Sequence, residues 1–294
     1  MNILVTGGSG FIGSHVVDKL IEAGHRVRVL DIKAPSHRKD IEYINGDITS
    51  EKDVRKSLSG IEVVCHIAAF ADINLVKDNP LKTIKYNIMG TAYLLEECRR
   101  QKVKRFLLAS TVFAYDEKGH LYTTSKVASE LLCKNYRTLY GLPYTILRYG
   151  TAYGPRNRGD DVIALFVKRA LNGENLVVRG KGEQKRNFIY IEDLAEGTVA
   201  ALAPVAENKV YTIVNKRAVS VKELAEIVRK TVNNKISIEY ETAREDDYLG
   251  VVPETSEIDR QNRELGWEAE INIEDGIRQY VEWYRRESGI DQVI

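Results

Sequence analysis

Short apolar runs alternate with amphipathic segments through the first half of this 294-residue chain. Strands are predicted for the runs at 3–5, 26–31, 61–69 and 105–111. The segments between them place apolar residues at helical spacing, as at Val16, Val17 and Leu20. From Met1 to about Leu147, this order predicts a parallel sheet with helices on both faces.

A glycine-rich turn, residues 6–13, follows the first predicted strand and leads into a helix. Gly7, Gly10 and Gly13 would let the backbone turn sharply, approach a pyrophosphate closely and pack helix against strand. The helix N-terminus would offer free N–H groups to an anion. The spacing G-x-x-G-x-x-G is a weak signal alone, and an ordinary strand-to-helix turn is the alternative.

The end of the next predicted strand distinguishes a dinucleotide-binding turn from an ordinary strand-to-helix turn. Asp31 stands there, close to the spacing at which a carboxylate accepts from both ribose hydroxyls of a dinucleotide. Its negative charge would repel the 2′-phosphate of NADP, so Asp31 favours NAD, although Lys33 nearby acts against that preference. The chain is therefore predicted to be an α/β protein with a Rossmann-type doubly wound parallel sheet.

The pattern changes after Tyr149, where a polar loop with several glycines precedes a predicted helix at 162–171. Shorter strands and helices follow, and Ser220 is a candidate N-cap. We expect a smaller, mixed α/β C-terminal domain. Its predicted extent is about 151–185 and 218–294, and the Rossmann domain takes 1–150 with about 186–217.

Composition excludes several functional classes. Charged residues make up 29% of the chain, yet both signs are interspersed and the formal net charge is +1, which argues against a nucleic-acid or anionic-membrane partner. No apolar run approaches the length of a bilayer span and the N-terminus enters a strand directly, so we expect a cytoplasmic protein. The three cysteines are predicted to be buried free thiols, and the five histidines have no metal-ligand spacing.

Tyr122 and Lys126 open a helix that is predicted to end at Gly141, and residues four apart share a helix face. A nearby ammonium favours phenolate, so the pair predicts a lowered tyrosine pKa and a base near neutral pH. Roughly one Y-x-x-x-K is expected by chance in such a chain. This one comes just after a strand that ends at Thr111, in a chain with a dinucleotide turn, and we interpret it as catalytic. His66 is interpreted as a satisfied core histidine.

Together these residues resemble the extended short-chain dehydrogenase/reductase family, specifically the NAD-dependent sugar-nucleotide epimerases and dehydratases of the UDP-glucose 4-epimerase type. The resemblance covers nearly the whole chain. It rests on 6–13, Asp31, Asp47-Ile48, 66–69, Asn87, Gly90-Thr91, Ser110-Thr111, Tyr122 with Lys126, 148–155, 186–193, Arg244, Asp247 and 265–267. It implies an NAD-binding first domain, a second domain that binds a nucleotide sugar, and a homodimer.

The resemblance also implies the mechanism. Tyr122 would be the acid/base that takes the proton of the C4 hydroxyl as hydride passes to NAD, and Lys126 would bind the nicotinamide ribose and lower the tyrosine pKa. Thr111 would hydrogen-bond the sugar hydroxyl. In an epimerase, the 4-keto sugar then turns over and receives the hydride on its other face.

The remaining implied roles concern binding. Cofactor contacts are implied for Gly7, Gly10, Phe11, Ile12, Gly13, Asp31, Asp47, Ile48, Ile67, Ala68, Ala69, Asn87, Ser110, Tyr122, Lys126 and Tyr149. Substrate contacts are implied for Thr111, Thr151, Asp161, Val162, Arg186, Arg244 and Asp247. Arg186 would take the diphosphate, which a guanidinium fork suits, and no metal is implied.

Three departures from the family pattern bear on the reaction. Val112 and Phe113 stand where dehydratases carry an Asp-Glu pair, which disfavours dehydration by that route. Thr151 replaces an asparagine, and Asp161 and Ala164 replace an Asn–Pro pair. The segment 116–121 is shorter than the usual loop that covers the sugar, so the sugar could differ from glucose or galactose.

The expected function is an NAD-dependent 4-epimerase of a nucleotide sugar, with a UDP-hexose of the UDP-glucose or UDP-galactose type as substrate. One alternative is an NAD-dependent dehydratase or oxidoreductase of another nucleotide sugar. A second alternative is a non-catalytic dinucleotide-binding regulator. The Tyr122–Lys126 pair disfavours that last reading, because such regulators typically lose it.

Overall fold

The structure is a computed structural model, and it describes residues 1–116, 120–242 and 251–289. The contacts divide the chain into two compact units. The first comprises Met1–Tyr149, Ala195–Ile213 and Asp259–Trp267, and the second comprises Gly150–Leu194, Val214–Ile258 and Glu268–Ile294. In this division, 186–194 and 214–217 fall in the second unit and 259–267 falls in the first, whereas the predicted division had each of them in the other domain.

The first unit is built on a seven-stranded sheet in which all neighbouring strands are parallel. The strand order is β11-β6-β5-β4-β1-β2-β3. The strands are β1 (Asn2–Thr6), β2 (Arg26–Asp31), β3 (Glu42–Asn45), β4 (Val63–His66), β5 (Arg105–Thr111), β6 (Tyr144–Tyr149) and β11 (Lys209–Ile213). The order reverses direction between β1 and β4, so the predicted doubly wound sheet is confirmed, with its switch point beside the glycine turn.

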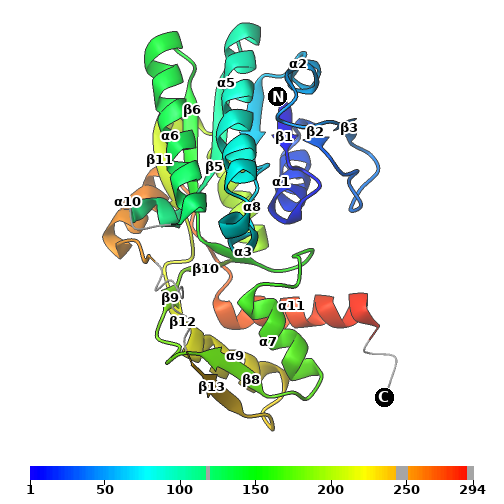
Figure 1. The fold of residues 1–294 in the computed structure, drawn as a ribbon, viewed down its shortest axis with the longest axis vertical. Coiled ribbons are helices and arrows are strands. Elements are labelled where there is room, and N and C mark those ends of the chain that lie inside the picture. Colours follow the sequence, from blue (N-terminus) through cyan, green and yellow to red (C-terminus); the bar gives the residue numbers. More distant parts are fainter. Residues whose placement is uncertain (117–119, 243–250, 290–294) are drawn as a thin grey trace. The chain divides into compact units, whose positions relative to one another are not determined.

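Helices connect these strands (Figure 1). They are α1 (Phe11–Glu22), α2 (Glu51–Leu58), α3 (Ile73–Asp78), α4 (Pro80–Thr83), the π-helix η1 (Ile84–Met89), α5 (Gly90–Gln101), the 3₁₀ turn η2 (Val112–Tyr115), α6 (Leu121–Tyr140), α8 (Ile191–Ala200), the 3₁₀ turn η3 (Pro204–Ala206) and α10 (Thr255–Leu265). Helix α6 ends at Gly141, which adopts the left-handed conformation that the sequence predicted there.

Each face of the sheet buries its own set of side chains. Leu4 and Leu30 pack in one cluster with apolar residues of α2, α5 and α6. Val5 and Val29 are also fully buried and alternate with them, so they point to the other face. There the glycine turn packs between β2 and α1, because a Cβ on Gly8 would lie 2.7 Å from a methyl group of Val29 and 3.2 Å from one of Val17. The core therefore fixes the carboxyl ends of the strands, where the candidate residues lie.

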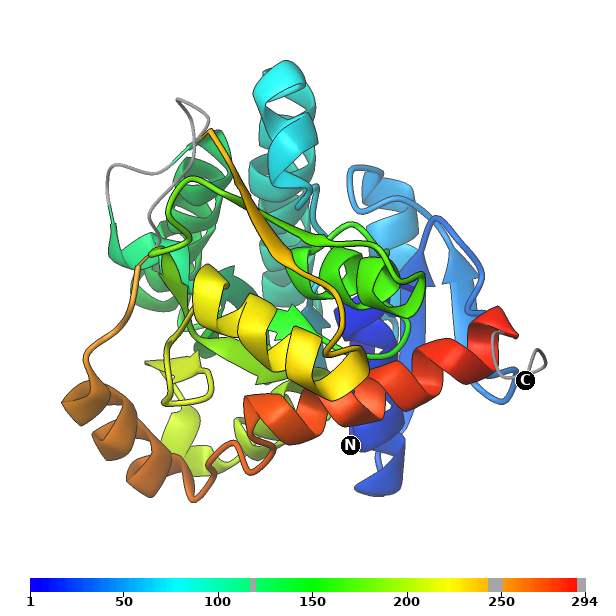
Figure 2. The ribbon, with the colours of Figure 1, turned by 90° about the horizontal axis from the view of Figure 1, so that it is seen from below.

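The second unit has three two-stranded sheets and three helices of its own among the described residues. They are β7 (Thr151–Tyr153) with β10 (Phe188–Tyr190), β9 (Lys185–Arg186) with β12 (Val219–Ser220), β8 (Leu176–Arg179) with β13 (Ile238–Glu241), and α7 (Val162–Leu171), α9 (Val221–Val232) and α11 (Ile273–Ser288). Helix α9 packs between α7 and α11 over a core that includes Phe166, Leu224 and Tyr280 (Figure 2). The predicted N-cap Ser220 accepts from the backbone N–H of Glu223.

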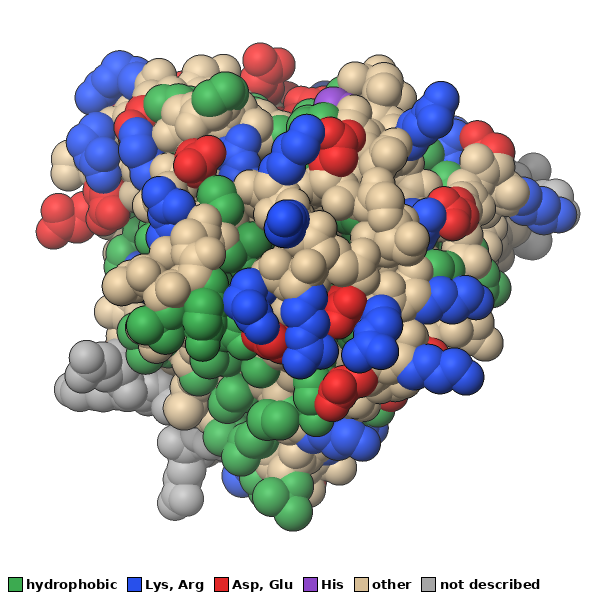
Figure 3. All heavy atoms as spheres, turned by 90° about the horizontal axis from the view of Figure 1, so that it is seen from above, with side chains coloured by type: hydrophobic (Ala, Val, Ile, Leu, Met, Phe, Trp, Pro, Cys, Tyr) green, Lys and Arg blue, Asp and Glu red, His purple; other side chains and the backbone are tan. Residues whose placement is uncertain are grey.

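On the surface, both signs of charge are interspersed, as Figure 3 shows for one face. Several large hydrophobic side chains of η1 and α6 are exposed: Ile84, Met89, Leu131, Leu139 and Tyr140. A homodimer through the helices that contain residues 87–97 and 126–136, as the family resemblance implies, stays a prediction. None of the helices in the described part of the chain is long and apolar enough to cross a membrane.

Candidate active site

The glycine turn has the geometry that the sequence predicts. Gly7 has a φ of +72°, and its N–H donates to the carbonyl of Leu30 at 3.0 Å. A Cβ on Gly7 would lie 2.7 Å from the backbone nitrogen of Ala68, just beyond β4. A Cβ on Gly13 would lie 2.0 Å from the carbonyl oxygen of Gly7. Both positions therefore require glycine, since only a bare backbone lets β1, β4 and α1 approach so closely.

The N-terminus of α1 opens onto this turn. Its N-cap residue is Gly10, which supplies no side-chain hydrogen bond, and its first turn carries no acidic residue. The N–H groups of the first turn and the positive end of the helix dipole are therefore available to an anion. With the strand switch point beside it, this cradle fits the pyrophosphate of a dinucleotide.

Asp31, the last residue of β2, lies beside the cradle. One carboxylate oxygen accepts from the backbone N–H of Ser9 at 3.1 Å, and the other accepts from that of Lys33 at 3.0 Å. Each carboxylate oxygen has a further lone pair, so each can also accept a hydrogen bond from a ribose hydroxyl. The backbone thus holds the carboxylate next to the turn, where its charge opposes a 2′-phosphate.

We expect Asp31→Asn to reduce the preference for NAD over NADP by at least about tenfold, because removing the charge removes the repulsion of a 2′-phosphate. The amide oxygen can still accept from the N–H of Ser9, and the exposed N–H of Lys33 can donate to water instead, so the turn should stay folded. Titration calorimetry with each dinucleotide measures the ratio. The matched control is Asp40→Asn, which changes an exposed carboxylate that pairs with Arg38. An unchanged ratio for Asp31→Asn would show that the carboxylate does not face the ribose.

Helix α6 brings Tyr122 and Lys126 to the end of β5. The Lys126 ammonium donates to the carbonyl of Ala109 at 2.9 Å and lies 5.8 Å from the centroid of the Tyr122 ring. Thr111 is the last residue of β5, and its hydroxyl accepts from the N–H of Phe113 at 3.3 Å. Lys126 is only 5% exposed, whereas Tyr122 is partly accessible. A phenol, an ammonium and a hydroxyl thus occur in one region of the first unit.

The prediction about the tyrosine pKa is wrong for the chain alone. Burial raises the pKa of Tyr122 to about 12, and no contribution from Lys126 offsets this. Burial lowers the pKa of Lys126 to about 8, partly opposed by the Glu130 carboxylate. Desolvation therefore outweighs the attraction between phenolate and ammonium. At neutral pH, Tyr122 holds its proton in the protein without cofactor.

Several residues that the sequence assigned to cofactor binding have side chains engaged within the first unit. The Asn87 amide donates to the Ser125 hydroxyl at 2.9 Å and exchanges hydrogen bonds with the backbone of Phe70. Asn87 lies in the π-helix, a feature frequent at functional sites. Tyr149 shares a hydrogen bond of 2.8 Å with the Thr198 hydroxyl. The side chains of Asn87 and Tyr149 therefore connect segments of the first unit to one another.

The remaining residues assigned to cofactor contacts follow β3 and β4 or begin α1. Asp47 accepts from Thr49, and Tyr86 donates to it at 3.3 Å. Ile48 is buried, whereas Phe11, Ile12, Ile67, Ala68 and Ala69 are partly accessible. His66 is confirmed as a satisfied core histidine, because its two ring nitrogens bond the hydroxyls of Thr6 and Thr91. Burial lowers the pKa of His66 to about 3.

Apart from Thr111, the described substrate candidates lie in the second unit. Asp161 caps α7, with one oxygen accepting from the N–H groups of Ile163 and Ala164 and the other accepting from Asn157 at 2.7 Å. Val162 begins that helix. Thr151 begins β7, and Arg186 ends β9 with its guanidinium partly accessible. Arg244 and Asp247 lie outside the described residues.

A buried ion pair escaped the sequence analysis. Glu130 of α6 accepts from Ser110 at 2.6 Å and from two nitrogens of Arg148 at 3.0 and 2.8 Å. Glu130 is 2% exposed. It follows Lys126 by four residues, so its position on the same helix face was readable from the spacing alone. The sequence analysis named Arg148 only as the first residue of the segment 148–155, which carries part of the family resemblance.

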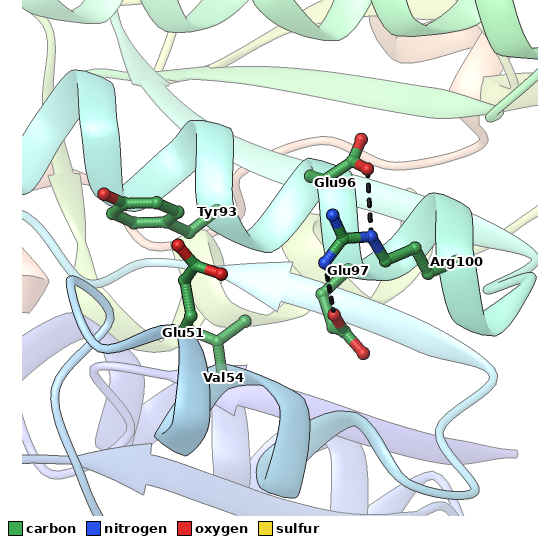
Figure 4. Close-up of a pocket in the computed structure, with 6 residues that line it drawn as sticks. All are labelled: Glu51, Val54, Tyr93, Glu96, Glu97 and Arg100. Atoms are coloured by element: carbon green, nitrogen blue, oxygen red, sulfur yellow. Dashed lines mark ion pairs between the residues drawn. The ribbon is translucent and has the colours of Figure 1, made fainter.

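A small pocket lies elsewhere in the first unit, between α2 and α5 (Figure 4). It is lined by Glu51, Val54, Tyr93, Glu96, Glu97 and Arg100. Arg100 pairs with Glu96 and Glu97, which also pair with Arg99 and Arg55, so two of the pocket's three carboxylates already have cationic partners. None of the candidate site residues lines this pocket. Among the described residues, no group of His, Cys, Asp and Glu side chains could hold a metal ion.

Comparison with known proteins establishes the family. Residues 3–215 match the model of the NAD dependent epimerase/dehydratase family. The chain belongs to this family. NAD is therefore its cofactor, and the glycine cradle with Asp31 fits that dinucleotide. The family's fold agrees with the seven-stranded sheet described above.

Individual family members are similar along their whole length. A Methanocaldococcus jannaschii protein provisionally named UDP-glucose 4-epimerase is 32% identical over 96% of this chain and 98% of its own. The UDP-glucuronate 4-epimerase of Thermodesulfobacterium geofontis is 31% identical over 95% of both chains. The solved UDP-glucose 4-epimerase of Thermotoga maritima, in complex with UDP-glucose, has 31% identity and a TM-score of 0.91, covering 98% of this chain and all of its own. The protein is thus a member of the nucleotide-sugar epimerases and dehydratases.

Proposed function

We propose that the protein is a 4-epimerase of a nucleotide sugar, with a UDP-hexose of the UDP-glucose or UDP-galactose type as its substrate. The observation that carries this proposal is the turn η2 after Thr111. It places Val112 and Phe113 next to the candidate sugar-binding hydroxyl, and the first carboxylate after Thr111 in the sequence is Asp116. The names of two similar proteins, both 4-epimerases, point the same way.

The proposed roles follow from the geometry. When bound, NAD supplies a hydride acceptor for C4 and a positive charge that favours the Tyr122 phenolate. Tyr122 takes the proton of the C4 hydroxyl and later returns it. Lys126, held by the Ala109 carbonyl, orients the nicotinamide ribose, and Thr111 hydrogen-bonds the sugar hydroxyl. Arg186 binds the diphosphate through its planar fork of donors.

The groups proposed above meet the needs of epimerisation better than those of elimination. Inversion at C4 needs one acid/base that works in both directions. Loss of water needs a separate acid and base, and the buried carboxylate beside Ser110 is not free to serve. Glu130 is paired with Arg148 through two hydrogen bonds. Among the described residues, Tyr122 is the proposed acid/base, and Val112 and Phe113 stand where a dehydratase would carry a further acid and base.

The experiment is to incubate the purified protein, with and without added NAD, with UDP-glucose, UDP-galactose, their N-acetyl forms and UDP-glucuronate. Mass spectrometry and NMR then follow the products. We expect a product of unchanged mass with inverted C4 from at least one UDP-hexose. Loss of water would instead establish a dehydratase, and loss of carbon dioxide a decarboxylase. No reaction with any of the five would favour a different nucleotide sugar or a non-catalytic regulator.

A further inference from the structure

The buried Glu130–Arg148 pair lies directly behind the candidate active centre. Helix α6 sends Tyr122, Lys126 and Glu130 towards the carboxyl ends of β5 and β6 at successive turns. Lys126 bonds the carbonyl of Ala109, and Glu130 bonds the hydroxyl of the next residue, Ser110. The two side chains thus hold adjacent residues of β5, and Thr111 follows immediately.

Arg148 completes the arrangement from β6. Two of its nitrogens donate to the two oxygens of Glu130, and its guanidinium carbon lies 4.4 Å from the centroid of the Tyr115 ring. The Tyr115 hydroxyl shares a hydrogen bond of 2.7 Å with Thr212 of β11. The pair is therefore anchored at both ends by packed elements of the sheet, and its geometry is fixed.

We propose that Glu130 and Arg148 are positioning residues of the active centre, in which Glu130 holds the end of β5 and stabilises the ammonium of Lys126 while Arg148 limits that stabilisation. This rests on the proposed role of Lys126 in cofactor and substrate chemistry. Neither residue touches the reacting atoms. Both act through Lys126 and through the backbone that carries Thr111.

Charge explains why two opposed groups are needed. The titratable and charged groups around Lys126 are Tyr122 and Glu130 of α6, His66 of β4 and, behind Glu130, Arg148 of β6. Tyr122 and His66 are neutral near pH 8, because burial raises the pKa of Tyr122 and lowers that of His66. Burial therefore disfavours the ammonium of Lys126 and Glu130 favours it, and the Arg148 guanidinium that pairs with Glu130 is expected to oppose the effect of that carboxylate.

The test measures the titration midpoint of Lys126 in the cofactor-free protein by NMR of ¹³Cε-labelled lysine. The Lys126 signal is assigned by its absence from the spectrum of Lys126→Arg. We expect the midpoint near pH 8 in the unaltered chain. In Glu130→Gln it should fall by at least about half a pH unit, because the carboxylate is lost and the guanidinium remains. In the double variant Glu130→Gln with Arg148→Gln, it should return towards the starting value, because both charges are gone.

The double variant also guards against a folding defect, since it leaves no buried charge without its counterion. The matched control is Glu62→Gln. That carboxylate pairs with Lys104 at 2.7 Å at the opposite, amino end of β5, so the midpoint should not move. A purely structural role would leave the midpoint unchanged in Glu130→Gln, or equally low in the single and double variants, and either result would overturn the proposal.

The outcome can be separated from that of the proposed function. The midpoint is measured without substrate or cofactor, so its response to the two variants stands even if none of the tested sugars reacts. If a sugar does react, the pH profile of kcat should move in the same direction as the midpoint in each variant. A midpoint that moves while the kcat profile stays fixed would mean that Lys126 does not govern the reaction, and the active-centre role of the pair would be wrong.

Discussion

Replacing Tyr122 with phenylalanine is expected to lower turnover by about 10²- to 10⁴-fold or more while NAD still binds. The substitution removes one hydroxyl and keeps the ring against its neighbours. Lys126 keeps its hydrogen bond to the Ala109 carbonyl, and the cradle is untouched. The rate of the chemical step should therefore fall while NAD affinity is kept, since that step loses the group that exchanges a proton with the substrate hydroxyl.

Turnover is measured with the sugar that reacts in the product assay, and NAD binding by calorimetry on the same samples. The matched control is Tyr136→Phe on the same helix, whose hydroxyl donates to Glu96 at 3.3 Å. That variant should keep the activity of the unaltered chain. Full activity in Tyr122→Phe would eliminate the proposed mechanism, and loss of NAD binding would show that the hydroxyl serves the cofactor instead.

The sequence predicted the first unit well because its signals are local. A glycine turn, the acid at the end of β2 and the Tyr122–Lys126 spacing each depend on residues close together in the chain. The sheet then brings them to one edge, since the carboxyl ends of parallel strands lie on the same side. The helix stop at Gly141 and the cap at Ser220 were predicted for the same local reason.

The sequence could not predict what depends on packing between distant segments. The pKa of Tyr122 follows from the burial of its phenol, which no spacing reveals, and burial reversed the predicted direction. Glu130 and Arg148 meet only because α6 crosses the ends of β5 and β6. The predicted domain division differs from the two compact units at 259–267 for a similar cause. Gln261 of that segment accepts from the backbone of Thr212 in the first unit, a contact 49 residues apart.

The substitution Gly13→Ala is expected to have the largest effect on the cofactor site. The new methyl group would lie 2.0 Å from the carbonyl oxygen of Gly7 and 2.7 Å from its carbonyl carbon. Both are backbone atoms, so α1 must move away from the end of β1. We expect a loss of about 3 kcal/mol in the free energy of unfolding, as for severe overpacking, and NAD affinity weakened by at least about tenfold. Denaturant unfolding and calorimetry measure the two quantities.

Two controls separate the causes of these losses. Gly10→Ala adds a methyl group in the same turn, where the nearest atom is 3.3 Å away, so its stability should change by less than about 1 kcal/mol. Gly276→Ala creates an equally short contact of 2.0 Å, with the Tyr153 hydroxyl in the second unit, and should destabilise the chain without weakening NAD binding. If Gly13→Ala instead retains both stability and NAD affinity, the close approach of helix and strand is not what forms the dinucleotide site. The cradle would then have to be sought elsewhere along the switch point, because family membership requires NAD but does not by itself say which backbone holds it.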